Sequence, residues 1–230
     1  MLTLHYIYDP FCGWCYAAAP LVAVARTVPQ LQLVLHGGGM LAGANRRTIT
    51  PDWREHVMPH DKRIAQLTGQ PFGEAYFEGL LRDIGAVMDS AQPIAAILAA
   101  EDLGDRGLDM LEAAQRAHYV DGLRIADPAI LAGLATNLGM DAEAFRQAFD
   151  RLVGAATHEH IGDSRTLLMQ LGGRGFPTFA LDIGDGQLER LDISMWLGRG
   201  EEWREFLAGR WAATARPGPL KGPRQTSCER

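Results

Sequence analysis

The sequence predicts an α/β fold that carries a large all-helical insertion after its second strand. Two strand-like runs, residues 2–8 and 31–36, flank a helix-length segment, as in a parallel β–α–β unit. Residues 50–172 show helical periodicity and no strand-like alternation. Two further strands and a closing helix come after that stretch. The predicted order is therefore β-α-β, a helical block, and α-β-β-α.

The N-terminal unit turns from strand to helix at Asp9 and Pro10, which end the run of β-forming residues. Apolar residues then recur at helical spacing from residue 13 to about 28, where Pro20 could kink the helix and Pro29 ends it. After the second strand comes the glycine-rich loop 37–43. It lacks the spacing of a phosphate-binding motif, so we interpret it as a tight loop.

Six helices are predicted in the block that follows. Thr50, Asp127 and Asp141 have side chains typical of helix N-caps, and proline and glycine residues mark the breaks. The predicted helices are 53–68, 72–83, 91–103, 107–120, 128–138 and 141–153.

The C-terminal part returns to mixed structure. A helix over 160–171 precedes strands at 178–182 and 187–191, joined by a glycine-rich turn, and an amphipathic helix over 201–213. Without the helical block the order is β-α-β-α-β-β-α, which is the thioredoxin fold. We therefore predict a thioredoxin-like domain from 1–48 and 158–214, an inserted helical domain at 49–157, and a flexible tail at 215–230.

Composition limits the classes of function. The chain has 230 residues, 47% hydrophobic and 22% charged, with a net charge of −6, which gives no electrostatic basis for binding nucleic acid. No apolar run reaches the roughly 18 residues of a membrane span, and the N-terminus lacks a basic leader. We expect a cytoplasmic protein with neither nucleic acid nor membrane partners; the oligomeric state stays open.

Cys12 and Cys15 stand at the first strand-to-helix turn, in the segment Asp9-Pro10-Phe11-Cys12-Gly13-Trp14-Cys15. Residues three apart share a helix face, and the N-terminal end of a helix favours negative charge on a cysteine sulfur. The sequence therefore predicts a redox pair, with Trp14 beside it as an apolar platform for substrate.

A zinc site is the main rival interpretation of the two cysteines. Zinc needs four ligands, and the one other cysteine, Cys228, lies in the tail. His56 and His60 are four residues apart, but Pro59 between them argues against a continuous helix; His158 and His160 cannot share a helical face. We predict no metal and no bound cofactor.

The chain resembles the DsbA family of thiol–disulfide oxidoreductases, and within it an unexported bacterial branch of predicted protein-disulfide isomerases, the FrnE-like proteins. The resemblance rests on the cysteine motif and three further segments: Asp89-Ser90-Ala91-Gln92-Pro93, residues 111–120, and Gly175-Phe176-Pro177-Thr178. It implies that Cys12 is the exposed nucleophile, that Cys15 is the buried resolving thiol, and that Pro177 is a cis-proline facing them.

The substrates implied are protein or small-molecule disulfides and thiols, with glutathione as a candidate redox partner. We expect Phe11, Trp14, Phe176, Pro177 and Thr178 to form the substrate surface, although Phe11 and Phe176 could equally belong to the core.

The sequence departs from the family pattern at the proton acceptor. Tyr6 occupies the position, six residues before Cys12, where the family usually has a buried carboxylate; Asp9 and His5 are near but do not match. The Gly13-Trp14 pair between the cysteines is also unfamiliar. Whether the protein oxidises, reduces or isomerises disulfides therefore stays open at this point.

Other residues allow a functional interpretation and a simpler one. Arg46 and Arg47 could clamp a carboxylate such as that of glutathione, but we favour a solvated surface pair. His118 and Tyr119 are best interpreted as packed aromatic residues, and Cys228 as a spare thiol rather than a third redox partner.

Two other functions remain as alternatives. Kappa-class glutathione transferases and 2-hydroxychromene-2-carboxylate isomerases share this fold, but they use a serine near the position of Cys12 and lack the second cysteine. A client-binding holdase would use an apolar cleft instead of the thiols.

Overall fold

The computed structural model describes residues 1–184 and 186–214, and its centre is a four-stranded sheet with the order β2-β1-β5-β6. Strand β1 (Leu2–Tyr8) runs parallel to β2 (Leu31–Gly37) and antiparallel to β5 (Thr178–Asp182), which pairs with β6 (Leu188–Leu191). This is the predicted thioredoxin arrangement. Because β1 and β2 are parallel, their carboxyl ends meet at one edge of the sheet.

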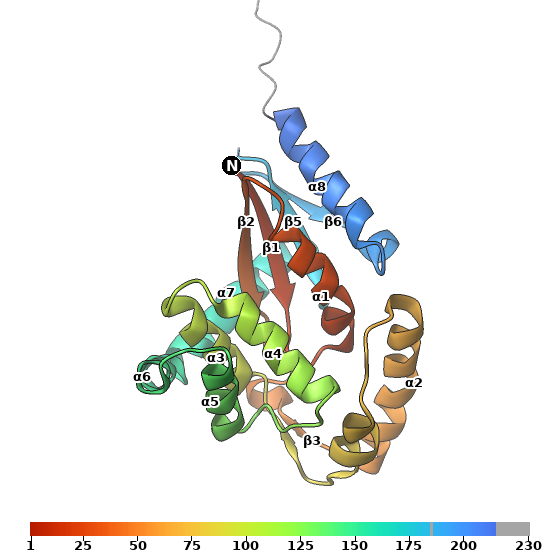
Figure 1. The fold of residues 1–230 in the computed structure, drawn as a ribbon, viewed down its shortest axis with the longest axis vertical. Coiled ribbons are helices and arrows are strands. Elements are labelled where there is room, and N and C mark those ends of the chain that lie inside the picture. The colour runs from red at the N-terminus through yellow and green to blue at the C-terminus, as the bar shows by residue number, and fades with distance from the viewer. Residues whose placement is uncertain (185, 215–230) are drawn as a thin grey trace, which may run out of the picture.

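Helices cover both faces of this sheet (Figure 1). Helix α1 (Gly13–Ala25) packs against the closing helix α8 (Gly200–Thr214), where the buried Trp203 indole donates a hydrogen bond to the Leu21 carbonyl at 3.0 Å. Helix α7 (Ala155–Gln170) packs against β2. The amphipathic pattern of the closing helix is thus satisfied by burial against α1 and the sheet.

The insertion lies beyond the carboxyl ends of β1 and β2 (Figure 1). Thr50, Asp127 and Asp141 cap their helices through side-chain oxygens that accept backbone N–H groups, as the sequence predicts. Its helices are α2 (Pro51–Thr68), α3 (Ala91–Asp102), α4 (Gly107–Tyr119), α5 (Pro128–Asn137) and α6 (Ala142–Leu152).

The insertion differs from the prediction in containing a short strand pair. Strand β4 (Val87–Met88) pairs antiparallel with β3 (Arg47–Thr48), a feature too short to produce an alternating pattern. The predicted helix 72–83 is replaced by a π-helical turn, Ala75–Gly79, and a 3₁₀ turn, Leu80–Arg82.

Proline does not interrupt two helices where the sequence suggested a break or a kink. Helix α2 continues through Pro59, and α1 continues through Pro20. The expectation that Pro59 separates His56 from His60 is therefore wrong, since one lost N–H bond is tolerated inside a long helix. Helix α7 begins at Ala155, so the boundary drawn between 157 and 158 falls inside it.

The expected flexible tail, 215–230, and with it Cys228, lies outside the described residues. Within the described part of the chain, no helix combines the length and the apolar character needed to cross a bilayer.

Candidate active site

Cys12 is the N-cap residue of α1. Its backbone is extended, with φ −88° and ψ 112°, and its carbonyl accepts the first helical hydrogen bonds, from the N–H groups of Cys15 at 2.9 Å and Tyr16 at 3.0 Å. No side chain caps this helix end. The unpaired N–H groups and the positive end of the helix dipole therefore favour negative charge on the Cys12 sulfur. Cys12 thus occupies the helix N-terminus, as the sequence predicts.

The two thiols differ in access to solvent. Cys12 is buried, with 7% of its surface exposed, so the expectation of an exposed nucleophile is wrong; its remaining access is through the cavity that it lines. Cys15 is fully buried one turn further on, and both thiols are unbridged. Burial, together with the neighbouring Cys12, raises the pKa of the Cys15 thiol well above its usual value. Cys15 therefore stays protonated until a base accepts its proton.

The loop before β5 lies against Cys12. The Cys12 thiol donates to the carbonyl of Phe176 at 3.4 Å, and the Phe176–Pro177 peptide bond is cis, as the resemblance implies. The side chain of Thr178 donates to the Gly175 carbonyl at 2.8 Å and holds the loop from within. The two halves of the thioredoxin-like part thus meet at the reacting sulfur.

Asp9 lies beside Cys15 and is fully buried. Its backbone N–H points at the Cys15 sulfur at 3.4 Å. Its carboxylate accepts hydrogen bonds from the Phe11 N–H at 2.9 Å, the Met40 N–H at 2.5 Å and the Ser90 hydroxyl at 3.1 Å. One carboxylate therefore joins the cysteine turn, the glycine-rich loop and the start of α3.

Burial raises the pKa of Asp9 from 3.8 to about 6, against the opposing effect of the three hydrogen-bond donors and the charge of Arg165. A carboxyl group with this pKa can take up and release a proton near neutral pH, which an acid–base partner of Cys15 requires.

Tyr6 does not replace the missing carboxylate. Its hydroxyl donates to the Cys15 carbonyl at 3.1 Å, and its ring stacks on Phe179 with centroids 4.7 Å apart. Burial raises the pKa of Tyr6 well above its usual value, so it stays a neutral structural residue. His5 also lies apart from the thiols, because its Nδ1 pairs with Nε2 of His36 at 2.9 Å.

A cavity of about 290 Å³ opens onto Cys12. Phe11 forms part of its wall and packs edge-on against His118 with centroids 5.0 Å apart, so Phe11 is a buried wall residue rather than an exposed rim. His118 and Tyr119 are buried aromatic residues, as expected, and they too line this cavity. Burial lowers the pKa of His118 to about 3, so its ring is neutral.

The insertion supplies a buried carboxyl group to the wall of this cavity. Asp61, on α2, accepts a hydrogen bond from the Tyr76 hydroxyl at 2.8 Å. Its other oxygen lies so close to α1 that a Cβ on Gly13 would come within 2.7 Å of it. Burial raises the pKa of Asp61 to about 6.

The remaining predicted substrate residues meet on the other side of Trp14. Trp14, Phe176, Pro177 and Thr178 all line a cavity of about 490 Å³, and Trp14 also lines the Cys12 cavity. The half-buried Trp14 therefore forms a wall common to both cavities, consistent with its predicted role as a platform.

The parts played by Asp61, Tyr76 and Ser90 were not predicted. Ser90 belongs to one of the segments that carry the family resemblance, which is the one signal that could have singled it out. Asp61 and Tyr76 lie on a helix and a π-helical turn whose packing onto α1 cannot be inferred from spacing. The rings of His56 and His60 are 5.2 Å apart, yet no group of three metal-ligating side chains occurs among the described residues.

The fold and the paired thiols define a thioredoxin-fold thiol–disulfide oxidoreductase. The family model described as DSBA-like thioredoxin domain matches residues 3–202, and the chain belongs to this family.

Among solved structures, the chain is similar to cytosolic disulfide reductase DsbM from Pseudomonas aeruginosa. The two are 52% identical with a TM-score of 0.87, over 92% of this chain and 99% of that chain. DsbM solved with GSH gives 50% identity and a TM-score of 0.85, over 91% of this chain and 99% of that chain. A putative protein disulfide isomerase from Nitrosomonas europaea shares the fold, at 24% identity and a TM-score of 0.75, over 94% and 99% of the two chains. No curated protein matches the chain significantly.

Proposed function

We propose that this protein is a cytoplasmic disulfide reductase that takes its electrons from glutathione through Cys12 and Cys15. The observation that carries the proposal is the asymmetry of the two thiols. Cys12 lies at a helix N-terminus and lines an open cavity, whereas Cys15 is fully buried against Asp9. The similarity to the cytosolic reductase DsbM, solved with GSH, supports the direction of electron flow, the electron donor and the compartment.

The reaction begins when the Cys12 thiolate attacks one sulfur of a substrate disulfide. The S–S bond breaks, the first substrate thiolate leaves, and a mixed disulfide forms on Cys12. Cys15 then gives up its proton and attacks the Cys12 sulfur, which releases the second thiolate and leaves a Cys12–Cys15 disulfide. The substrate has gained two electrons and two protons.

Two glutathione molecules restore the enzyme. The first attacks the Cys12–Cys15 disulfide and forms a glutathionyl mixed disulfide; the second attacks that bond and leaves as glutathione disulfide. The sum is one substrate disulfide and two glutathione molecules converted into two substrate thiols and one glutathione disulfide. No metal or bound cofactor enters the cycle.

Asp9 is the proposed proton acceptor for Cys15. It is the buried carboxyl group that contacts this thiol through its own backbone, and burial places its pKa at about 6. Its carboxylate form takes the Cys15 proton during the resolving step, and the proton then passes to the departing thiolate.

The substrate surface is proposed to lie around Trp14. A disulfide-bearing chain would rest on the Trp14 ring and run along Phe176, Pro177 and Thr178, where the carbonyl of Phe176 is available beside Cys12. Phe11 would contact the substrate from the wall of the Cys12 cavity.

Reduction of bis(2-hydroxyethyl) disulfide, coupled through glutathione reductase to NADPH oxidation, tests the proposal. Wild type should turn over, Cys12→Ser should be inactive, and Cys15→Ser should accumulate a mixed disulfide on Cys12. Parallel variants in a Cys228→Ser background show whether the third thiol contributes.

Full activity in the Cys12→Ser variant would contradict the mechanism. Tight glutathione binding by the Cys12→Ser, Cys15→Ser double variant would favour a glutathione transferase. Suppression of client aggregation by that double variant would identify a thiol-independent holdase activity.

A further inference from the structure

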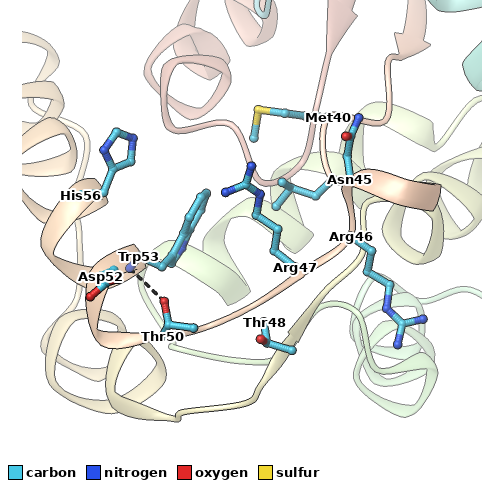
Figure 2. A pocket seen from close by; sticks show the side chains of 10 residues that line it. Met40, Asn45, Arg46, Arg47, Thr48, Thr50, Asp52, Trp53 and His56 are labelled. Atoms are coloured by element: carbon cyan, nitrogen blue, oxygen red, sulfur yellow. Dashed lines mark hydrogen bonds between the residues drawn. The ribbon is translucent and has the colours of Figure 1, made fainter.

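A larger hollow adjoins the Cys12 cavity on the side of the insertion. Its volume is about 900 Å³, and it shares three wall residues with the Cys12 cavity: Met40, Trp53 and His56. The two spaces therefore adjoin along one wall. A molecule with its sulfur at Cys12 could place another part of itself in this hollow, shown in Figure 2.

Arg47 directs its cationic side chain into this space. Its guanidinium lies over the Trp53 ring, with 5.7 Å between the guanidinium carbon and the ring centroid. Figure 2 shows it pointing inward between Trp53 and Met40. Its backbone is held in the β3–β4 pair, opposite Met88. The direction of the Arg47 side chain is therefore set at its backbone by strand pairing and at its guanidinium by the Trp53 ring.

The neighbouring Arg46 is oriented differently. Arg46 also lines the hollow, but in Figure 2 its side chain points away from Trp53 and Met40, and its guanidinium lies 3.9 Å from the carboxylate of Asp89. Among the described residues, no carboxylate forms an ion pair with Arg47. Asp52 also lines the hollow, but its carboxylate points away from the Arg47 guanidinium in Figure 2. Both arginines are exposed, as expected for a surface pair, but their guanidinium groups point in different directions.

We propose that Arg47, supported by Trp53, binds a carboxylate of the small disulfide or thiol whose sulfur reacts at Cys12. The preferred small substrates and electron donors are then anionic peptide thiols and their disulfides, a class that includes glutathione. An Arg–carboxylate pair is bidentate and charge-assisted, so it gives both affinity and orientation. This inference rests on the proposed function, because it concerns the recognition step that precedes the exchange at Cys12.

Kinetics with two disulfides test the proposal. Glutathione disulfide carries carboxylates and bis(2-hydroxyethyl) disulfide carries none, and reduced enzyme in single turnovers can be offered either one. Arg47→Gln should lower the apparent second-order rate constant for glutathione disulfide about tenfold, the size expected for one charge-assisted hydrogen-bonded pair, and leave that for the neutral disulfide unchanged. Arg47→Lys should fall between wild type and Arg47→Gln, because it keeps the charge and loses the planar fork.

Arg46→Gln is the matched control, since it removes the same charge one residue away. It should change both rate constants less than twofold. An equal loss of the rate constant for glutathione disulfide in Arg46→Gln and Arg47→Gln would overturn the proposal. It would mean that the positive charge of the surface as a whole, not a subsite at Arg47, attracts the anion. An Arg47→Gln loss of the same size with the neutral disulfide would also overturn the proposal.

Binding of S-methylglutathione separates this proposal from the proposed function, because this probe cannot exchange its sulfur. Calorimetry should show weaker binding to Arg47→Gln than to wild type and Arg46→Gln, and no such difference for the dimethyl ester of the probe. Selective binding by an enzyme that reduces no disulfide would reject the proposed function and keep the subsite. Equal binding by wild type and Arg47→Gln would reject the subsite even if the reductase activity is confirmed.

Discussion

The Cys12 sulfur lies 3.4 Å from the main-chain carbonyl oxygen of Phe176, although 164 positions separate the two residues in the chain. The contact joins the first strand-to-helix turn to the loop before β5, across the whole insertion. A substrate that reaches Cys12 therefore meets the Phe176–Pro177 backbone at the same time. The reactive sulfur and the surface that would hold its substrate form one unit.

The difference in burial predicts a difference in reactivity between the thiols. In a Cys228→Ser background, iodoacetamide should alkylate Cys12 in the Cys15→Ser variant at least tenfold faster than Cys15 in the Cys12→Ser variant. The reason is that Cys15 is fully buried and its pKa is raised by that burial, so thiolate is scarce. Mass spectrometry of timed samples measures both rates; comparable rates would show that Cys15 is as accessible as Cys12.

Asp9→Asn should slow the resolving step about 100-fold, the low end of the range for loss of a general base. In wild type, release of the second substrate thiol should accelerate as the pH rises through about 6, where Asp9 becomes a carboxylate, and then level off. The Asn variant should lose this inflection. Rapid-quench single turnovers between pH 5 and 8 measure the release.

Ser90→Ala provides the control for this pH profile. It keeps the carboxyl group and removes a hydroxyl donor that favours the ionised form, so the pKa of Asp9 and the inflection should move upward. An unchanged profile in Asp9→Asn would show that another group accepts the Cys15 proton.

Asp61→Asn should stabilise the fold at neutral pH. Burial raises the pKa of Asp61 from 3.8 to about 6, so the folded state binds its proton more tightly than the unfolded state. The protonated Asp61 carboxyl group therefore stabilises the folded state. This stabilisation is complete below about pH 4, near the pKa of an unfolded aspartate, and is lost as the pH rises through 6. At pH 7.5 the free energy of unfolding should therefore increase in the variant, on the order of 2 kcal/mol, and at pH 4 the difference should largely vanish.

Urea denaturation at the two pH values measures this effect. Asparagine can still accept the hydrogen bond from the Tyr76 hydroxyl, so the comparison isolates the charge. Asp9 keeps a pH dependence of the same sign in the variant. A loss of stability at pH 7.5 would mean that the ionised form of Asp61 is favoured by the fold.

Gly38→Ala should disturb the loop that faces Cys12. A Cβ at Gly38 would lie 2.1 Å and 2.3 Å from two ring atoms of Phe176, so that ring must move. We expect a loss of about 1–3 kcal/mol in stability, as for an overpacked core, together with slower disulfide reduction. Gly133→Ala on α5 is the matched control, because nothing lies within 4 Å of its Cβ position and alanine favours a helix. Unaltered stability and activity in Gly38→Ala would show that the Phe176 ring can move aside without a loss of free energy or function.

The framework of the fold could be predicted from the sequence because its strands and most of its helices are long and periodic. Strand β1 and strand β5 have the predicted bounds, and the N-caps Thr50, Asp127 and Asp141 begin helices as their side chains suggest. The exceptions are features that are very short or that depend on tertiary packing. A two-residue strand such as β4 has no period to detect, and the effect of Pro59 on α2 depends on tertiary packing.

The site was predictable as far as local sequence determines it. Cys12 and Cys15 derive their positions from one strand-to-helix turn, and Pro177 from a recognisable motif. Asp9 was not identifiable as the partner of Cys15, because its environment comes from Met40 and Ser90, which are distant in the chain. Arg46 and Arg47 are adjacent in sequence and differ in the structure because one of them lies over Trp53. Long-range packing, which no spacing encodes, makes these distinctions.

The reduction potential of the Cys12–Cys15 pair tests most directly the claim that this protein is a reductase. Equilibration with glutathione buffers of known ratio, followed by alkylation and mass spectrometry in a Cys228→Ser background, measures it. We predict a potential in the range of thioredoxins and glutaredoxins, roughly −270 to −200 mV, well below that of a strong disulfide donor. A value near −120 mV, the potential of a strong disulfide donor, would contradict the account and make the protein an oxidant.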